Sequence, residues 1–314
     1  MFESLPPLLA LVLGLALLVK GADWLVDGGV RIAGRLGMSP VMVGLTIIAW
    51  GTSLPELLVS TLAAADGRPG MALGNALGSN IANIGLVLGV TALLLPGVLG
   101  SALRLREAGW LLASLLGLFL VLLWQGGISA VGGWLLIGLF VVHNIHLWKT
   151  AKPGEEQEPQ PKGQGIMRRA LLLVLVASVA VAIGAELTVS GAEAIARSIG
   201  VSDRVIGLSV VAIGTSLPEL AAGVASALKG QTEIGVGNVV GSNVFNVLVA
   251  VGSAGVVQPF VDESAEAALW SDIPAVLLFS FAAILLPRLG SSGRWKGAAL
   301  FAGYLTFLWI QFKA

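Results

Sequence analysis

The chain has 314 residues, of which 56% are hydrophobic and only 11% are charged, and its formal net charge is zero. This composition, with a mean hydropathy of +0.92, excludes a soluble globular domain and predicts an integral membrane protein. The neutral balance lacks the basic excess of a nucleic-acid-binding protein, and the absence of cysteine excludes disulfides and thiolate metal sites.

Apolar runs of about 20 residues predict ten membrane-spanning helices. Their approximate bounds are 5–30, 40–65, 70–96, 105–124, 127–148, 168–195, 204–227, 231–257, 270–287 and 295–312. The first apolar run follows an acidic residue and no basic segment, so we expect no cleaved signal peptide.

Ten spans place both termini on the same side of the membrane. If the termini are outside, thirteen Lys and Arg residues fall in the inside segments and four in the outside segments. The positive-inside rule therefore predicts that both termini are extracytoplasmic. No segment is typical of targeting to an organelle, which favours the inner or plasma membrane of a prokaryotic cell.

The sequence contains a long internal repeat. The motif GTSLPEL begins at Gly51 and again at Gly214, 163 residues later, and the same offset pairs many further residues without a gap. We interpret residues 1–148 as a first five-helix repeat, 149–169 as a flexible cytoplasmic linker, and 170–314 as a second five-helix repeat. Because five is odd, the second repeat must enter the membrane from the opposite face, so the repeats are inverted.

Each GTSLPEL copy predicts a broken helix, the second and the seventh of the ten. Pro55 and Pro218 have no N–H to donate within an otherwise helical run, so each helix should open and leave backbone oxygens free at membrane depth. Glu56 and Glu219 follow these prolines directly. An intramembrane carboxylate is expensive, so two at equivalent positions indicate a functional site.

The next span of each repeat carries a polar stripe on an apolar helix. Its residues recur every four positions and are Asn75, Ser79 and Asn83 in the first repeat and Asn238, Ser242 and Asn246 in the second. Gly74 with Gly78, and Gly237 with Gly241, form small-xxx-small patterns that should allow close helix packing. We therefore expect the stripes to approach the broken helices.

These groups suit a hard cation. Bidentate Glu56 and Glu219, with the carbonyls of Thr52 and Thr215, would supply six oxygens, and Ca²⁺ takes 6–8. Two carboxylates balance one Ca²⁺, two Na⁺ or two protons, so mutually exclusive occupation would produce exchange. A structural alternative is that both acids are protonated and only pack the core.

At these motifs the sequence resembles the calcium/cation antiporter superfamily, most closely its prokaryotic sodium/calcium exchanger-like branch. The two GTSLPEL segments, together with GNALGSNIANI and GNVVGSNVFNV, correspond to the paired alpha repeats of that family. The resemblance implies an all-α integral membrane protein with ten transmembrane helices in two inverted five-helix repeats, exchanging Ca²⁺ against Na⁺ by alternating access.

The resemblance also implies roles for individual residues. Glu56 and Glu219 would bind both ions, and the carbonyls of Thr52 and Thr215 would complete the calcium site. The positions that match sodium ligands are Ser53, Ser79, Ser216, Ser242 and the carbonyls of Ala49 and Ala212. Asn83 and Asn246 match a central polar pair. Some relatives, including potassium-dependent ones, carry Asp at the position of Asn246, so potassium coupling is not expected.

Three alternatives remain open from the sequence. The same carboxylates could exchange Ca²⁺ or another divalent cation against protons, they could act as the acid pair of an intramembrane hydrolase, or the protein could be a membrane scaffold or receptor. The expected partners are Ca²⁺, Na⁺ and the lipid bilayer, with no cofactor, no nucleic acid and no obligate protein partner. Four other acids, Asp27, Glu186, Glu193 and Asp272, either line an ion access path or mark the ends of spans.

Overall fold

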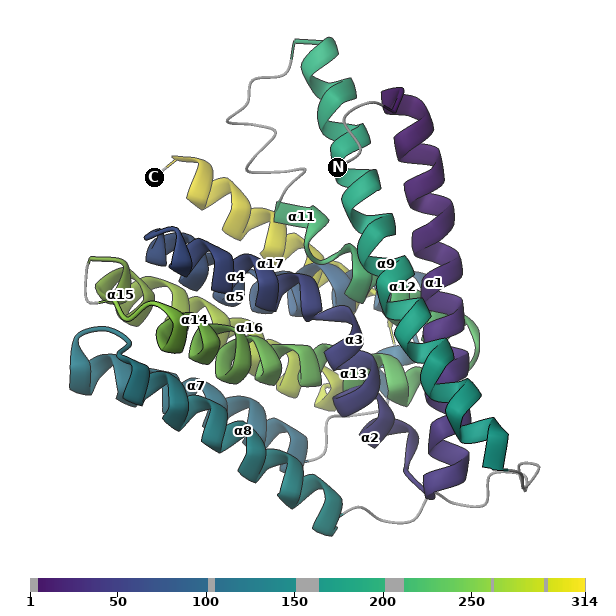
Figure 1. Cartoon of the computed structure of the whole chain (residues 1–314), viewed down its shortest axis with the longest axis horizontal. Coiled ribbons are helices and arrows are strands. Elements are labelled where there is room, and N and C mark those ends of the chain that lie inside the picture. The colour runs from purple at the N-terminus through teal and green to yellow at the C-terminus, as the bar shows by residue number, and fades with distance from the viewer. Residues whose placement is uncertain are drawn as a thin grey trace.

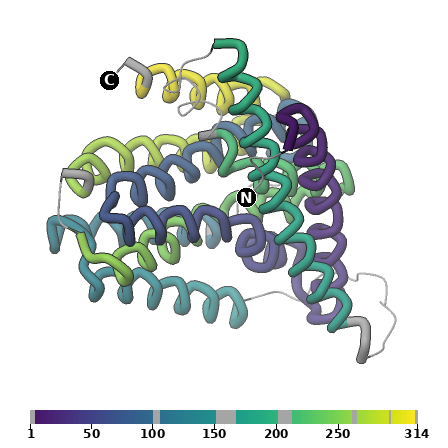
Figure 2. Tube along the Cα trace, turned by 45° about the horizontal axis from the view of Figure 1, so that its top comes forward, coloured from purple at the N-terminus to yellow at the C-terminus, as the bar shows by residue number. Residues whose placement is uncertain are grey.

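A computed structural model describes residues 5–100, 105–150, 164–200, 212–260, 263–290 and 293–313, and most of these residues are helical. Figure 1 shows two long helices, α1 and α9, side by side, which cross a bundle made of the remaining helices at a steep angle. The tube in Figure 2 shows the same division from a second direction.

The first half of the chain forms five successive helical spans. Their elements are α1 (Pro7–Leu36); α2 (Pro40–Val43), η1 (Gly44–Ile48), α3 (Ala49–Thr52) and α4 (Leu54–Ala65); α5 (Pro69–Ala82), η2 (Asn83–Leu88) and α6 (Gly89–Leu94); η3 (Val98–Gly100) with α7 (Leu105–Gln125); and α8 (Ala130–Thr150). The elements η1 and η2 are π-helical turns that continue the helices around them.

The second half repeats this order where it is described. Its elements are α9 (Gln164–Ser198); α11 (Ala212–Gly214) and α12 (Leu217–Leu228); α13 (Thr232–Phe245), η5 (Asn246–Ala250) and α14 (Val251–Val257); α15 (Glu263–Ala267), η6 (Ala268–Asp272), α16 (Ile273–Leu285) and η7 (Leu286–Arg288); and α17 (Arg294–Lys313).

Within the described residues, seven helices are long and apolar enough to cross a membrane, or eight if the bent pair Pro40–Thr52 and Leu54–Ala65 is one span. The seventh predicted span, 204–227, begins outside the described residues, and its described part includes the short apolar helix α12. The tenth corresponds to α17, a 20-residue helix that is not among the seven. Most of the predicted linker, 151–163, also lies outside the described residues.

Two spans form the centre of the bundle. The most apolar stretch is 78% buried in Pro69–Leu94 and 94% buried in Thr232–Val257, whereas in the other candidate spans this share is 28–44%. These two spans carry the polar stripes predicted from the sequence. Their polar side chains are therefore held away from lipid, where each unsatisfied group would cost free energy.

Helices α1 and α9 pack against each other through glycines. A Cβ added at Gly14 would lie 2.5 Å from the backbone N of Thr188, and one at Gly21 would lie 2.9 Å from the backbone N of Val181. As the residue number rises along α1, the number of its contact on α9 falls, so the two helices run antiparallel (Figure 1). Larger residues at these positions would force the backbones apart.

A second close contact joins the broken helix to the central helix α13. A Cβ at Gly237 would lie 2.6 Å from the carbonyl oxygen of Val41, and one at Gly241 would lie 2.5 Å from that of Leu45. The predicted close packing is thus confirmed for α13. It is wrong for Gly74 and Gly78 on α5, where an added Cβ meets nothing within 4 Å, because these two glycines line a cavity.

An ion-pair cluster ties α1 to the connection between α12 and α13. The ammonium of Lys229 lies 2.7 Å from a carboxylate oxygen of Asp23 and 2.5 Å from one of Asp27. Partial desolvation lowers the pKa of Lys229, but its hydrogen bonds and ion pairs with these two acids outweigh that effect and raise the pKa above its ordinary value. Lys229 is therefore cationic at neutral pH.

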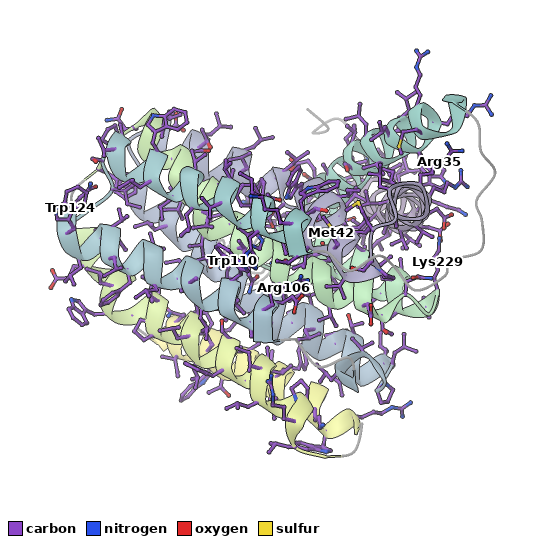
Figure 3. All side chains as sticks on the ribbon, turned by 90° about the horizontal axis from the view of Figure 1, so that it is seen from below. Arg35, Met42, Arg106, Trp110, Trp124 and Lys229 are labelled. Atoms are coloured by element: carbon purple, nitrogen blue, oxygen red, sulfur yellow. The ribbon has the colours of Figure 1, made fainter. Side chains whose placement is uncertain are left out.

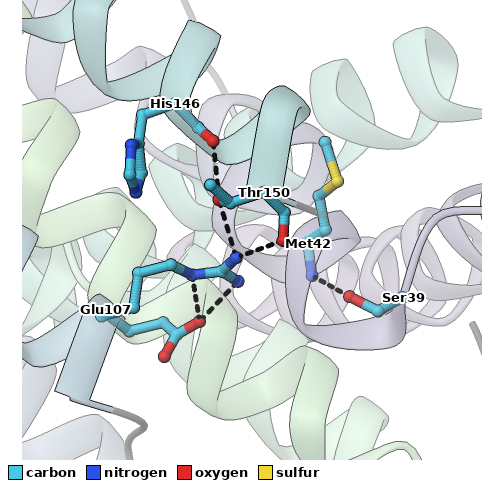
Figure 4. Close-up of polar contacts among 6 residues, drawn as sticks. Ser39, Met42, Glu107, His146 and Thr150 are labelled. Atoms are coloured by element: carbon cyan, nitrogen blue, oxygen red, sulfur yellow. Dashed lines mark hydrogen bonds and ion pairs between the residues drawn. The ribbon is translucent and has the colours of Figure 1, made fainter. Parts of the chain in front are cut away.

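A polar cluster at one end of the α7–α8 pair fixes the start of α7 to the end of α8. Arg106 donates to the Glu107 carboxylate at 2.8 Å and to the carbonyl and hydroxyl oxygens of Thr150, both at 2.9 Å. Figure 4 shows the bonds that reach Glu107, Thr150 and the carbonyl of His146. Glu107 is buried by this arrangement but belongs to no repeated motif.

We expect Gly237→Ala to lower the free energy of unfolding by about 1–3 kcal/mol, because its Cβ would overlap a backbone carbonyl that cannot move independently of the helix. The matched control is Gly74→Ala at the equivalent position of the first repeat, which should be neutral or slightly stabilising. Thermal unfolding of both purified variants in the same detergent checks this. Equal losses would contradict the packing difference between α13 and α5.

Candidate functional site

The predicted break in the second span lies at Ser53, between α3 and α4, and the segments Pro40–Thr52 and Leu54–Ala65 are bent by 48°. Ser53 has φ −90° and ψ 9°, and its N–H donates to the carbonyl of Ala49 at 3.0 Å. Pro55 lies in the first turn of α4, where a missing N–H removes no helical hydrogen bond. Glu56 lies in that same turn, at the helix end that favours negative charge.

The second GTSLPEL copy adopts the same local conformation. Ser216 has φ −92° and ψ 3°, and its N–H donates to the carbonyl of Ile213 at 3.1 Å. The helix α12 then begins with Pro218 and Glu219 in its first turn. Identical sequence thus produces two helix N-termini, each carrying a glutamate.

Both carboxylates are completely buried. The hydroxyl of Ser53 donates to Oε1 of Glu219 at 2.9 Å, and the hydroxyl of Ser242 lies 3.4 Å from the same oxygen. The other carboxylate oxygen of Glu219 and both oxygens of Glu56 have no hydrogen-bond partner in the described part of the chain. Glu56 and Glu219 are close enough to interact electrostatically. Buried oxygens without partners are rare in folded proteins and call for an explanation.

Further buried polar atoms surround these acids without partners of their own. They include Oδ1 of Asn83, both polar side-chain atoms of Asn246, and the hydroxyl of Ser216. The hydroxyl of Thr52 donates to Oδ1 of Asn238 at 3.2 Å, so the first broken helix is bonded to the central helix α13. The shell thus consists of amide and hydroxyl groups, whose oxygens can bind a cation.

Two asparagines that the sequence analysis did not single out join the two central spans. Nδ2 of Asn80 donates to the carbonyl of Asn243 at 3.1 Å, and Nδ2 of Asn243 donates to the carbonyl of Asn80 at 3.2 Å. Asn83 also donates to Oδ1 of Asn243 at 3.0 Å. A signal for the pair existed, because the repeated Gly-Ser-Asn places them 163 residues apart.

The central spans change their helical geometry at the candidate site. The π-helical turn η2 begins at Asn83, and the π-helical turn η5 begins at the equivalent Asn246. Such turns are uncommon and occur frequently at functional sites, where they re-aim side chains and leave backbone carbonyls less tightly bonded. Their equivalent placement was not predicted from the sequence.

The remaining predicted residues lie around this centre. Ser79 is buried on α5, and Thr215 is half-buried in the break between α11 and α12. Ala49 is buried, and its carbonyl also accepts a hydrogen bond from the hydroxyl of Thr52 at 3.3 Å. Ala212 is the first residue of α11, and its side chain lies outside the description.

Asn75, the first residue of one polar stripe, cross-links the first broken helix. Its Nδ2 donates to the carbonyl of Glu56 at 3.1 Å and to the hydroxyl of Ser60 at 2.9 Å. These bonds hold α5 against α4 and fix the backbone of Glu56. Asn75 thus positions the glutamate rather than facing it.

A cavity of about 630 Å³ lies beside the candidate site, between helices α4, α5, α9, α12 and α17. Ser79 and Thr215 line it, together with Asn75 and the single carboxylate of Glu186, and most of its other lining is apolar. The cavity therefore reaches two of the predicted site residues from one side. Glu56 and Glu219 themselves lie behind this lining.

The groups gathered at this centre are oxygen-rich and contain no soft metal ligand among the described residues. Within the described residues, no group of three or more His, Cys, Asp or Glu side chains is placed to hold a metal ion. A cation here would be held by two carboxylates and by neutral oxygens of Ser, Thr, Asn and the backbone. Such a donor set favours cations such as Ca²⁺ and Na⁺ over soft transition metals.

Comparisons with known proteins agree with this arrangement. The family described as sodium/calcium exchanger protein matches residues 6–149 and 169–313. The putative antiporter CaxA of Alkalimonas amylolytica is 39% identical over 96% of this chain and 98% of its own length. The sodium/calcium exchanger MaX1 of Methanosarcina acetivorans is 31% identical over 97% of this chain and 98% of its own.

Solved structures of the sodium-calcium exchanger NCX_Mj share the fold. The structure soaked with 10 mM Na⁺ and zero Ca²⁺ matches with a TM-score of 0.79 and 33% identity, over 96% of this chain and 97% of that one. The helical membrane fold, the two buried glutamates and these relatives lead to the same conclusion: the chain belongs to the sodium/calcium exchanger protein family.

Proposed function

We propose that the protein is a secondary active antiporter that exchanges Ca²⁺ against Na⁺ by alternating access. The observation that carries this proposal is the pair of fully buried glutamates, three of whose four carboxylate oxygens have no hydrogen-bond partner in the described residues. A bound cation would satisfy these oxygens. We choose Na⁺ as the coupling ion because MaX1 and NCX_Mj are both named as sodium/calcium exchangers. The site is also rich in neutral oxygens, which suit Na⁺.

The proposed cation site takes its ligands from both GTSLPEL copies. Glu56 and Glu219 bind Ca²⁺ with the carbonyls of Thr52 and Thr215, and the same carboxylates hold Na⁺ when Ca²⁺ leaves. The neutral sodium ligands are Ser53, Ser79, Ser216, Ser242 and the carbonyls of Ala49 and Ala212. Asn83 and Asn246 complete the centre. The side-chain oxygens of Ser216, Asn83 and Asn246, which have no hydrogen-bond partner in the described residues, support this assignment.

Two inverted five-helix repeats, 1–148 and 170–314, form the proposed architecture, with 149–169 as a cytoplasmic linker. The antiparallel packing of the equivalent helices α1 and α9 supports the inversion. So do the reciprocal hydrogen bonds of the equivalent residues Asn80 and Asn243. The two segments matched by the family, 6–149 and 169–313, fit the same division.

The proposed orientation places both termini on the extracytoplasmic side, from the thirteen-to-four distribution of basic residues. In Figure 3, Arg35 and Lys229 lie toward one end of the molecule and Trp124 lies at the opposite end. This fits the orientation, in which both basic residues are cytoplasmic and Trp124 is not.

The coupling ion can be measured directly. Vesicles that contain the purified protein and are loaded with Na⁺ should take up ⁴⁵Ca²⁺. This uptake should stop when choline replaces the internal Na⁺, because in the proposed cycle the emptied carboxylates must bind Na⁺ before the site faces the outside again. A proton gradient without Na⁺ should give no uptake. Proton-driven uptake of equal rate would make the protein a proton/calcium antiporter instead.

Replacing either glutamate should abolish exchange. We expect Glu56→Gln and Glu219→Gln to lose ⁴⁵Ca²⁺ uptake and also the thermal stabilisation by Ca²⁺, which for a single site is about 2.7 kcal/mol when Ca²⁺ is at 100 times its Kd. Without Ca²⁺, Glu56→Gln should unfold at no lower temperature than the wild type, since it replaces a fully buried carboxyl group whose oxygens have no hydrogen-bond partner in the described residues.

Glu107→Gln is the matched control, because Glu107 is also a buried glutamate but lies in the α7–α8 cluster. It should retain uptake and the stabilisation by Ca²⁺. If all three variants lost uptake together, or if Glu56→Gln kept it, the assignment of the site to the GTSLPEL glutamates would be wrong.

A further inference from the structure

The cavity beside the candidate site has one feature that neither the repeats nor the proposed ligand set explains. Of the described residues that line it, only Glu186 on α9 carries a carboxylate. The side chain of Glu186 is exposed and makes no ion pair with the described residues. A single negative charge in a concave, largely apolar surface concentrates cations there, since the low-dielectric walls focus its field.

Helix packing places this carboxylate close to the second broken helix. A Cβ at Gly214 would collide with the side chain of Val189, so α9 packs directly against the break between α11 and α12. Glu186 lies three residues before Val189, on the same face and one helical turn away. Glu186 and Thr215 therefore line the same cavity.

Neutral oxygens in the same cavity complete a possible ligand set. Ser79 is only 3% exposed, lines the cavity, and makes no hydrogen bond with its hydroxyl within the described part of the chain. Asn75 and Thr215 also line it. The Ser79 hydroxyl is therefore available in the cavity to a cation or to its water shell.

The equivalent acid of the other repeat has a different environment. Asp23 lies 163 residues before Glu186, and it is neutralised by Lys229, which also binds Asp27. The residue equivalent to Lys229 in the first repeat is Asp66, so the chain supplies no lysine to Glu186 at that position. Of these two equivalent acids, Asp23 is therefore paired with a lysine, whereas Glu186 lines the cavity without an ion pair in the described residues.

We infer that Glu186, with Asn75, Ser79 and Thr215, forms an outer cation site that binds a partly hydrated Ca²⁺ before the ion moves on to Glu56 and Glu219. This inference rests on the proposed function for its cargo. One carboxylate and a few neutral oxygens suit weak, fast binding, because calcium affinity rises with the number of charged ligands. A site that must release its ion inward benefits from such weakness.

The chain contains one tyrosine, Tyr304, and it lines this cavity, so it can report binding directly. Tb³⁺ is a hard, oxygen-binding substitute for Ca²⁺, and its emission rises when a nearby aromatic ring transfers energy to it. Purified protein should show Tb³⁺ emission that depends on Tyr304, identified by its loss in Tyr304→Phe, and that Ca²⁺ displaces.

Variants then separate the two sites. The Tyr304-dependent emission should vanish in Glu186→Gln and persist in Glu56→Gln and in the control Glu193→Gln, whose residue lies on α9 but not in the cavity lining. Emission that survives Glu186→Gln, or that is absent from the wild type, overturns the outer site. Because the assay needs no transport, it decides this point even if the wild type fails to exchange Ca²⁺ for Na⁺.

Transport gives an independent readout. With Ca²⁺ supplied to the side of the cavity, Glu186→Gln should raise KM for Ca²⁺ about three- to tenfold and leave the maximal rate within about twofold, because it slows capture and not translocation. The increase should shrink at high ionic strength, and Glu186→Asp should restore most of the wild-type KM. An unchanged KM, or a fall in maximal rate alone, contradicts the inference.

Discussion

The complete burial of Glu56 and Glu219 in an apolar bundle is the constraint on which the rest of the structure depends. An uncompensated charge at such a position costs at least about 2.5–3.5 kcal/mol even on insertion scales. The chain compensates in part by ending one helix at Thr52 and another at Gly214, so that each glutamate lies in the first turn of a new helix. Hydroxyls satisfy one oxygen of Glu219, and the oxygens that remain are available to a cation.

Equivalent residues of the two halves have different environments. Gly237 packs against the broken helix, whereas its counterpart Gly74 borders the cavity. Ser53 bonds Glu219, whereas the hydroxyl of its counterpart Ser216 has no partner in the described residues. Two copies of one sequence therefore differ in packing at one position and in hydrogen bonding at another. An antiporter built from repeats needs this asymmetry, because exchanging the two environments exposes the central site to the other side.

The sequence was informative where chemistry is encoded locally. The missing N–H of Pro55 predicts a break, which lies at Ser53, and the four-residue spacing of Asn75, Ser79 and Asn83 predicts a polar face on a helix that proved central. It was uninformative where identical segments differ only through their neighbours. No local pattern distinguishes Gly74 from Gly237, and the bonds between Asn80 and Asn243 exist only because two spans meet face to face.

The packing of α1 against α9 joins the helix that carries Asp23 to the helix that carries Glu186. Glycine contacts bring these backbones so close that a shift of one helix carries the other, since interfaces packed at this density have few alternative arrangements. Asp23, which holds Lys229, lies on α1, and Glu186, which lines the cavity, lies on α9. Helix α12 contacts both members of this pair, so the ion pair of Asp23 and the cavity beside Glu186 both depend on how the α1–α9 pair packs against α12.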